Sequence, residues 1–157
     1  MPTWTGTLDN SGSPVIKISI YGVLDTMAQE FDAIVDTGFT GFLSMPMVDA
    51  FPLGLVLAGT TTTVLADGSL SNKLVALGTA AVGSEQQRGS ILLNMGSGPS
   101  DILIGMEFLR VFQKTLIVTR GGVALIDNAE IAEAIQRATP NPTPPTNAPS
   151  SAPPPSA

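Results

Sequence analysis

Short apolar segments separated by turn residues constrain the fold of this chain most strongly. In segment 15–23, Ile16, Ile18 and Ile20 alternate with Lys17 and Ser19, the pattern of a strand with one buried face. Further short segments are predicted strands: 3–8, 29–35, 60–66, 69–77, 80–82, 90–95, 102–104, 115–119 and 123–126. None approaches the ~20 apolar residues of a membrane-spanning helix. The pattern predicts a mainly β domain of roughly seven to nine strands.

Turns and short helices follow from local residue choices. Asp67-Gly68 supplies the positive φ that a tight hairpin turn requires, so it is predicted to join segments 60–66 and 69–77. The polar stretch 83–89 is predicted to be a turn between two further strands. Helical spacing predicts short helices over 106–112 and 129–138, the second capped by Asn128. Ser44 and Pro46 mark the start of another possible short helix, which would extend to Phe51.

The chain divides into two parts by composition. Residues 139–157 consist of Pro, Ser, Thr, Asn and Ala, and they hold eight of the thirteen prolines. A segment without charged or large apolar side chains cannot offset the entropy cost of ordering, so a disordered tail is predicted there. Residues 1–138 are long enough for a single domain with its own core.

Composition also limits the chemistry of the chain. It contains no His and no Cys, which excludes a Ser-His-Asp triad, a Cys-His pair, a zinc site of the H-E-x-x-H type and a thiolate cluster. We therefore expect no cofactor and no metal, and a hydrolase of this composition would depend on carboxylates. Thirteen acidic side chains against seven basic ones make a nucleic-acid partner unexpected. Without a leader or membrane-spanning pattern, we expect no membrane association and a cytoplasmic location.

One triplet places a carboxylate on a tight turn between two apolar segments. Asp36-Thr37-Gly38 follows Ala33-Ile34-Val35 and precedes Phe42-Leu43. Asp and Gly are also favoured in ordinary turns after strands, so a purely structural turn is the simplest alternative. Asp36 is nevertheless predicted to lie where the strand over 29–35 ends.

The pattern resembles the retropepsin-like (clan AA) family of aspartic peptidases. Three features carry the resemblance in the family's order: Asp36-Thr37-Gly38, the hairpin around Asp67-Gly68, and Leu103-Ile104-Gly105 followed by a helix. The resemblance implies a closed β-barrel with one or two short helices and the activity of an aspartic endopeptidase. It assigns the catalytic motif to Asp36, Thr37 and Gly38.

The resemblance also implies a homodimer. Members of the family carry one Asp-Thr-Gly per chain, as this sequence does, while the chemistry requires two facing carboxylates. Two carboxylates within hydrogen-bond reach share one proton, so that one activates a water while the other bonds the scissile carbonyl. Thr37 would bond the neighbouring chain beneath the aspartates, and Gly38 would let the backbone approach the carboxylate. The expected partners are a second copy and a peptide or protein substrate.

Substrate binding is expected from the flap and the second motif. The resemblance places the flap tip near Ala66, Asp67 and Gly68, and it assigns Ile104 and Gly105 to the second motif. An acid at the tip is unusual for a surface that must grip an apolar peptide.

The chain departs from the family at three positions. Phe39 stands where pepsin-like enzymes have Ser, which predicts a pH optimum above about 3. Many retroviral members pair an Arg and an Asp at the positions that hold Met106 and Thr40 here, so one dimer-stabilising ion pair is missing. The alternatives to the enzyme are an inactive retropepsin-like peptide-binding or dimerisation module, and a purely structural all-β protein.

Overall fold

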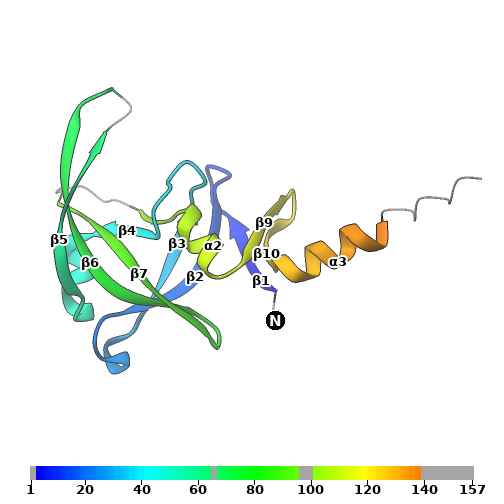
Figure 1. Ribbon diagram of the computed structural model, residues 1–157, viewed down its shortest axis with the longest axis horizontal. Helices are drawn as coiled ribbons and strands as arrows, with labels where there is room; N and C mark the ends of the chain where they lie inside the picture. The colour runs from blue at the N-terminus through cyan, green and yellow to red at the C-terminus, as the bar shows by residue number, and fades with distance from the viewer. Residues whose placement is uncertain (1–2, 65–66, 96–100, 139–157) are drawn as a thin grey trace, which may run out of the picture.

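Ten strands form one sheet in the part of the chain that the computed structural model describes, residues 3–64, 67–95 and 101–138 (Figure 1). The strands are β1 (Trp4–Leu8), β2 (Pro14–Tyr21), β3 (Gln29–Val35), β4 (Leu43–Pro46), β5 (Val56–Val64), β6 (Leu70–Val82), β7 (Glu85–Asn94), β8 (Ile102–Ile104), β9 (Lys114–Thr119) and β10 (Gly122–Asp127). The helices are α1 (Met47–Ala50), α2 (Met106–Val111) and α3 (Asn128–Ala138), with 3₁₀ turns at Asp25–Met27 and Phe51–Leu53. The predicted mainly β class is confirmed.

The strand order is β5-β6-β7-β4-β8-β3-β2-β1-β10-β9, and β6 also pairs with β2. That extra pairing runs from Ser19↔Ala81 to Tyr21↔Thr79, so the pairings lead from β6 through β7, β4, β8, β3 and β2 back to β6. That the sheet forms the expected closed β-barrel stays a prediction. The tail predicted at 139–157 lies outside the described residues.

The core confirms the alternation seen in the sequence. Ile16, Ile18 and Ile20 are buried, whereas Lys17 between them is exposed. A group of aromatic rings continues this core toward the C-terminal half, with ring centroids 5.2 Å apart for Phe42 and Phe108. Because Phe42 precedes β4 and Phe108 lies on α2, this contact fixes the helix against the segment that follows Asp36.

The predicted segments 69–77 and 80–82 are one continuous strand, β6, and two further predictions of local structure were wrong in detail. The stretch 83–89 is not a turn, because β7 begins at Glu85 and Gly83 takes the turn with φ +59°. Gln86 and Arg88 pair with Ala81 and Thr79 of β6, since polar side chains suit a strand whose one face meets solvent.

The second error concerns Ser44. It lies within the short strand β4 instead of starting a helix, and α1 begins only at Met47. Its burial in the sheet comes from pairing on both sides, with Leu92 of β7 and Leu103 of β8.

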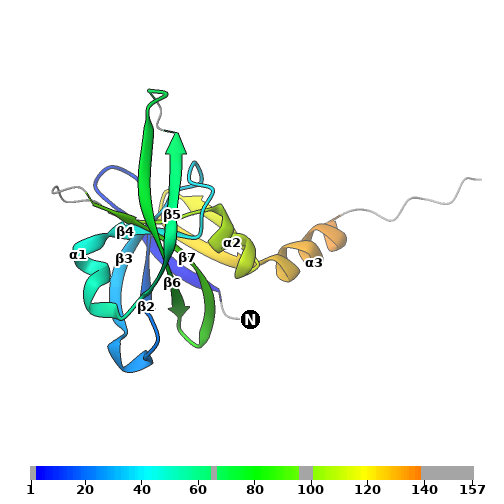
Figure 2. The same cartoon turned by 60° about the vertical axis from the view of Figure 1, so that its left-hand side comes forward.

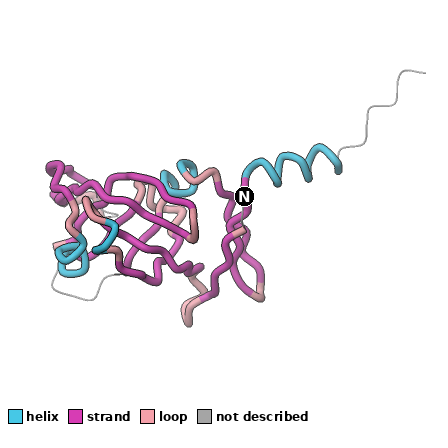
Figure 3. Tube along the Cα trace, turned by 90° about the horizontal axis from the view of Figure 1, so that it is seen from below, coloured by secondary structure: helices cyan, strands magenta, loops and turns pink. Residues whose placement is uncertain are grey.

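The C-terminal helix stands apart from the sheet. Figures 1 and 3 show α3 extending away from the strands, and none of its residues is buried. Asn128 is its first residue, and its Oδ1 accepts a hydrogen bond of 2.7 Å from the Thr115 hydroxyl. No helix among the described residues is long and apolar enough to cross a membrane.

A buried ion cluster joins strands that lie far apart in the strand order. The Lys114 side chain is fully buried, and its Nζ lies 3.0 Å from Glu85 Oε1 and 3.5 Å from Asp127 Oδ2. The same ammonium lies 4.6 Å from the centroid of the Trp4 ring. The cluster therefore links the start of β7 to β1, β9 and β10.

Replacing Lys114 with methionine is expected to lower the free energy of unfolding by about 3–5 kcal/mol, because two largely buried carboxylates lose their counter-charge. Urea denaturation measures the change. Lys17→Met is the matched control, since Lys17 pairs with Glu30 and Asp32 on an exposed surface, and its unfolding midpoint should hardly move. Similar midpoints for the two variants would contradict a stabilising role for the cluster.

Candidate active site

The Asp36 turn is held by its own backbone and by β8. Asp36 follows directly after β3, and its N–H donates to the Ile104 carbonyl at 2.9 Å. The Phe39 N–H donates to the Asp36 carbonyl at 3.1 Å and closes the turn. Asp36 is half-buried, whereas Thr37 and Gly38 are exposed. The turn therefore presents its side chains at the surface on a rigid backbone.

Gly38 contacts the carboxylate directly. Its N–H donates to Asp36 Oδ1 at 2.9 Å. A Cβ at Gly38 would lie 3.2 Å from the same oxygen, a distance that few real side chains tolerate. Glycine at this position therefore allows the backbone amide to approach the carboxylate and orient it.

The second motif crosses the Asp36 turn. Strand β8 lies between β3, which it pairs in parallel, and β4, which it pairs antiparallel, so Ile104 is the partner of both Val35 and Leu43. Beyond the strand, the Gly105 N–H donates to the Phe42 carbonyl at 3.1 Å and the Met106 N–H donates to the Phe39 carbonyl at 2.8 Å. Segments about seventy residues apart thus form one unit around Asp36.

Two glycines make this crossing possible. A Cβ on Gly105 would lie 2.0 Å from the Gly41 carbonyl oxygen, and a Cβ on Gly41 would lie 2.5 Å from the Phe39 ring. The Phe39 ring also comes within 2.7 Å of the Cβ position of Gly105, so it packs over both glycines. The sequence reasoning missed Gly41, although a glycine so soon after Asp36 was a usable signal for close packing.

The predicted flap is a long hairpin that stands clear of the body. β5 and β6 pair from Val56↔Leu77 to Val64↔Leu70, and Figures 1 and 2 show their hairpin rising on the same side as the loop between β3 and β4. At its tip, Asp67 Oδ1 accepts the Ser69 N–H at 2.9 Å and the Ser69 hydroxyl at 2.6 Å, and Gly68 has φ +80°. Ala66 lies outside the described residues.

These bonds predict a titration of Asp67 that NMR can measure. The Ser69 hydroxyl, followed by its backbone N–H, lowers the pKa of the Asp67 carboxyl below the ordinary value of 3.8. The ionised Asp67 carboxyl therefore stabilises the tip fully above pH 3.8, and this stabilisation is lost as the pH falls through the lower pKa of the folded state. Ser69→Ala should raise the pKa toward the ordinary value, and an unchanged pKa in that variant would contradict the assignment.

A groove of about 470 Å³ lies between the Asp36 turn and the hairpin. Its lining comes from the turn, the hairpin and the strands between them: Gly38, Phe39, Thr40, Gly41, Ser44, Thr61, Val64, Lys73, Leu92 and Leu103. Ile104 and Gly105 do not line it, because both are buried beneath the turn. Asp67 and Gly68 are exposed at the hairpin tip and do not line it either.

Three polar residues near this groove were not predicted from the sequence to belong to the site. Lys73 Nζ donates to Asn94 Oδ1 at 2.6 Å, and Asn94 Nδ2 donates to the Ser44 hydroxyl at 2.9 Å. The residues come from β6, β7 and β4. Only the strand pairing brings them together, so no local signal in the sequence could have revealed them.

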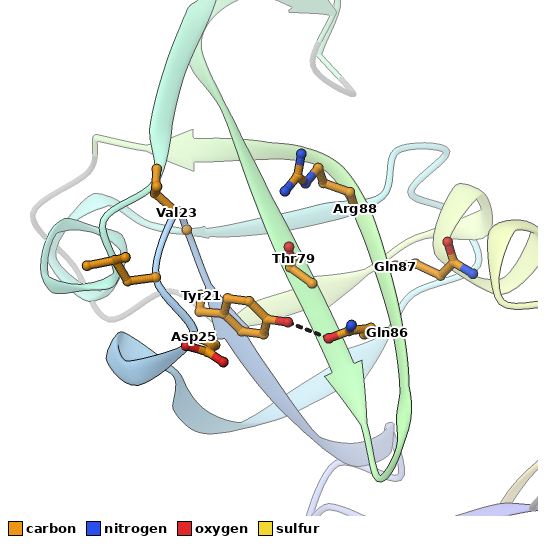
Figure 4. A pocket seen from close by; sticks show the side chains of 9 residues that line it. Tyr21, Val23, Asp25, Thr79, Gln86, Gln87 and Arg88 are labelled. Carbon is orange, nitrogen blue, oxygen red and sulfur yellow. Dashed lines mark hydrogen bonds between the residues drawn. The ribbon is translucent and has the colours of Figure 1, made fainter.

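A second, polar pocket lies at the opposite end of the β2–β3 pair (Figure 4). It encloses about 410 Å³ and is lined by Tyr21, Asp25, Thr79 and Arg88 among others, with the Tyr21 hydroxyl donating to Gln86. It contains none of the predicted site residues. No group of three or more His, Cys, Asp or Glu side chains within the described ranges could hold a metal ion.

Comparison with known proteins identifies a structural neighbour. No protein-family model matches the chain, and no curated protein sequence matches it. A solved structure described as a retropepsin-like aspartic protease from Rickettsia conorii superimposes with a TM-score of 0.55, covering 79% of this chain and 90% of that one. The fold is similar to that of a retropepsin-like aspartic protease. At 15% sequence identity this likeness shows the fold alone.

Proposed function

We propose that the chain is a homodimeric aspartic endopeptidase that activates water between two Asp36 carboxylates, one from each chain. The observation that carries the proposal is the position of Asp36. It is half-buried on a turn that is hydrogen-bonded to β8, and the neighbouring Gly38 lines the groove. The structural neighbour supports the same reading, because its fold is that of an aspartic protease.

The chemistry requires the second chain. Two facing carboxylates hold one proton between them, since ionising both at short range is costly. The ionised Asp36 takes a proton from the bound water, whose oxygen attacks the carbonyl carbon of the peptide, while the protonated partner hydrogen-bonds the carbonyl oxygen. Transfer of a proton to the amide nitrogen then lets the C–N bond break. A single chain supplies half of this apparatus.

An interface beside Thr37 would complete the site. The exposed Thr37 borders a hollow of about 680 Å³ that Thr40 and Met106 also line, and Met106 is 44% exposed. In the proposed dimer this surface faces the partner, and the Thr37 hydroxyl bonds the other chain beneath the aspartates. Thr40 and Met106 offer van der Waals contact where an ion pair would otherwise lie, so we propose a comparatively weak dimer.

The proposal is tested by incubating the purified protein with a diverse peptide mixture between about pH 4 and 7, where a shared-proton pair is active. Mass spectrometry should show new peptide termini, and a pepstatin-type inhibitor should suppress them. Sedimentation of the same sample reports the dimer. Equal, negligible cleavage by the wild type and by Asp36→Asn would instead favour a peptide-binding module that keeps the fold without turnover.

A further inference from the structure

We propose that Lys73 makes the groove selective for peptides that carry a carboxylate side chain, glutamate or aspartate, at one position. The inference rests on the proposed function in so far as the groove is the place where peptide binds. It concerns which peptides bind there, so it can be tested without hydrolysis.

Strand register places Lys73 on the groove face of the sheet. Lys73 pairs with Thr61 of β5, and Val75, two residues further along β6, pairs with Leu92 of β7. Leu92 in turn pairs with Ser44, and Ser44 pairs with Leu103. Alternate residues of a strand share a face, and directly paired residues do too. Lys73 therefore belongs to the same surface as Ser44, Leu92 and Leu103.

The Lys73 ammonium is held in place without a carboxylate. It is half-buried, and its bond to Asn94 fixes it through Asn94 to the buried Ser44. Lys17 and Lys114 both have carboxylate partners, but no ion pair involves Lys73 within the described part of the chain. An ammonium has three N–H donors and Asn94 accepts one, so the site is built to donate to a further acceptor.

A carboxylate is the ligand that best fits the surroundings of Lys73 in the groove. Lys73 is the only charged side chain among the described residues that line the groove, where Phe39, Leu92 and Leu103 provide apolar surface. A glutamate of the peptide would place its methylenes against that surface and accept a charge-assisted hydrogen bond from Nζ. A glutamine of the same shape would accept a weaker, uncharged bond.

The charge of the whole chain makes this selectivity distinct from general attraction. The net charge is −6, so long-range electrostatics disfavour acidic peptides. A preference for glutamate that arises at Lys73 must therefore depend on the position of the glutamate in the peptide. A uniform dependence on peptide charge would have the opposite sign.

The experiment measures binding to the full-length Asp36→Asn variant, so that cleavage does not compete with binding. The probes are fluorescein-labelled apolar decapeptides in which one position at a time is Glu, Gln or Lys, and anisotropy gives each Kd. At one position Glu should bind about five- to tenfold more tightly than Gln. Adding Lys73→Met should abolish this difference, Lys73→Glu should transfer the preference to Lys, and Lys73→Arg should retain it. Lys17→Met in the same background is the matched control and should change nothing.

Thermal unfolding of each variant shows that the comparison is between folded proteins, and the Lys73→Arg result keeps the test decisive if the methionine variant is unstable. Absence of a glutamate preference at every position, its persistence without Lys73, or failure of all peptides to bind would overturn the inference. Cleavage of the same peptides by the wild-type chain reports separately on the proposed function. Cleavage without a glutamate preference would contradict only the inference about Lys73. A glutamate preference in binding without cleavage would contradict only the proposed peptidase activity.

Discussion

Replacing Asp36 with asparagine is expected to lower kcat/KM for peptide hydrolysis by about 10³-fold or more, since an amide can neither take the proton of the attacking water nor share one with its mate. The fold should survive, because the Gly38 N–H can still donate to the side-chain oxygen it meets at 2.9 Å. Asp32→Asn is the matched control, as Asp32 lies on β3, the strand that ends just before Asp36, and pairs with Lys17 at the exposed surface. Loss of activity in both variants, or in neither, would contradict the assignment of Asp36.

The same variant tests whether two chains build one site. When equal amounts of wild type and Asp36→Asn are mixed and allowed to exchange, only about a quarter of random dimers contain two intact carboxylates. Activity per wild-type chain should therefore fall to about half as mixed dimers form. Activity that simply follows the amount of wild-type chain would show that each chain acts alone, and the dimeric mechanism would be wrong.

The parts of the fold that the sequence predicted well are those whose signal is local. Alternation along 15–23 gave β2 because every second residue faces the core. The end of β3 at Val35 and the turn at Asp36 were predicted for the same reason: apolar residues stop where the turn residues begin. Residues 86–88 were wrongly predicted as part of a turn, because their polar side chains are typical of a loop and the pairing with β6 cannot be seen in the local sequence.

The candidate site likewise contains residues that a local sequence pattern predicts and residues that only strand pairing brings together. Asp36, Thr37 and Gly38 are adjacent in the sequence, so one turn carries their geometry. The groove depends on Ser44, Lys73 and Leu92, which lie on three strands and meet through pairing alone. Ile104 and Gly105 were expected to bind substrate, and that role stays a prediction; their burial gives them a supporting place beneath the turn. Register between distant strands is the information that a local pattern lacks.

That supporting place makes Gly105 the most sensitive backbone position around the turn. Gly105→Ala is expected to lower the free energy of unfolding by about 3 kcal/mol and to reduce activity with it. The new Cβ would lie 2.0 Å from the Gly41 carbonyl oxygen and 2.7 Å from that of Phe39. Both are backbone atoms, and the Met106 N–H holds the Phe39 carbonyl in place at 2.8 Å. Neither atom can move without displacing the turn that carries Asp36.

The cost at Gly105 is steric and not conformational, since its φ of −101° and ψ of −177° are extended values that alanine adopts freely. Gly121→Ala isolates the effect, because a Cβ there would meet nothing within 4 Å. Urea denaturation should leave the Gly121 variant close to the wild type and shift only the Gly105 variant. Equal midpoints would mean that the crossing of the two motifs can relax, and Asp36 would then owe its position to the β3 turn alone.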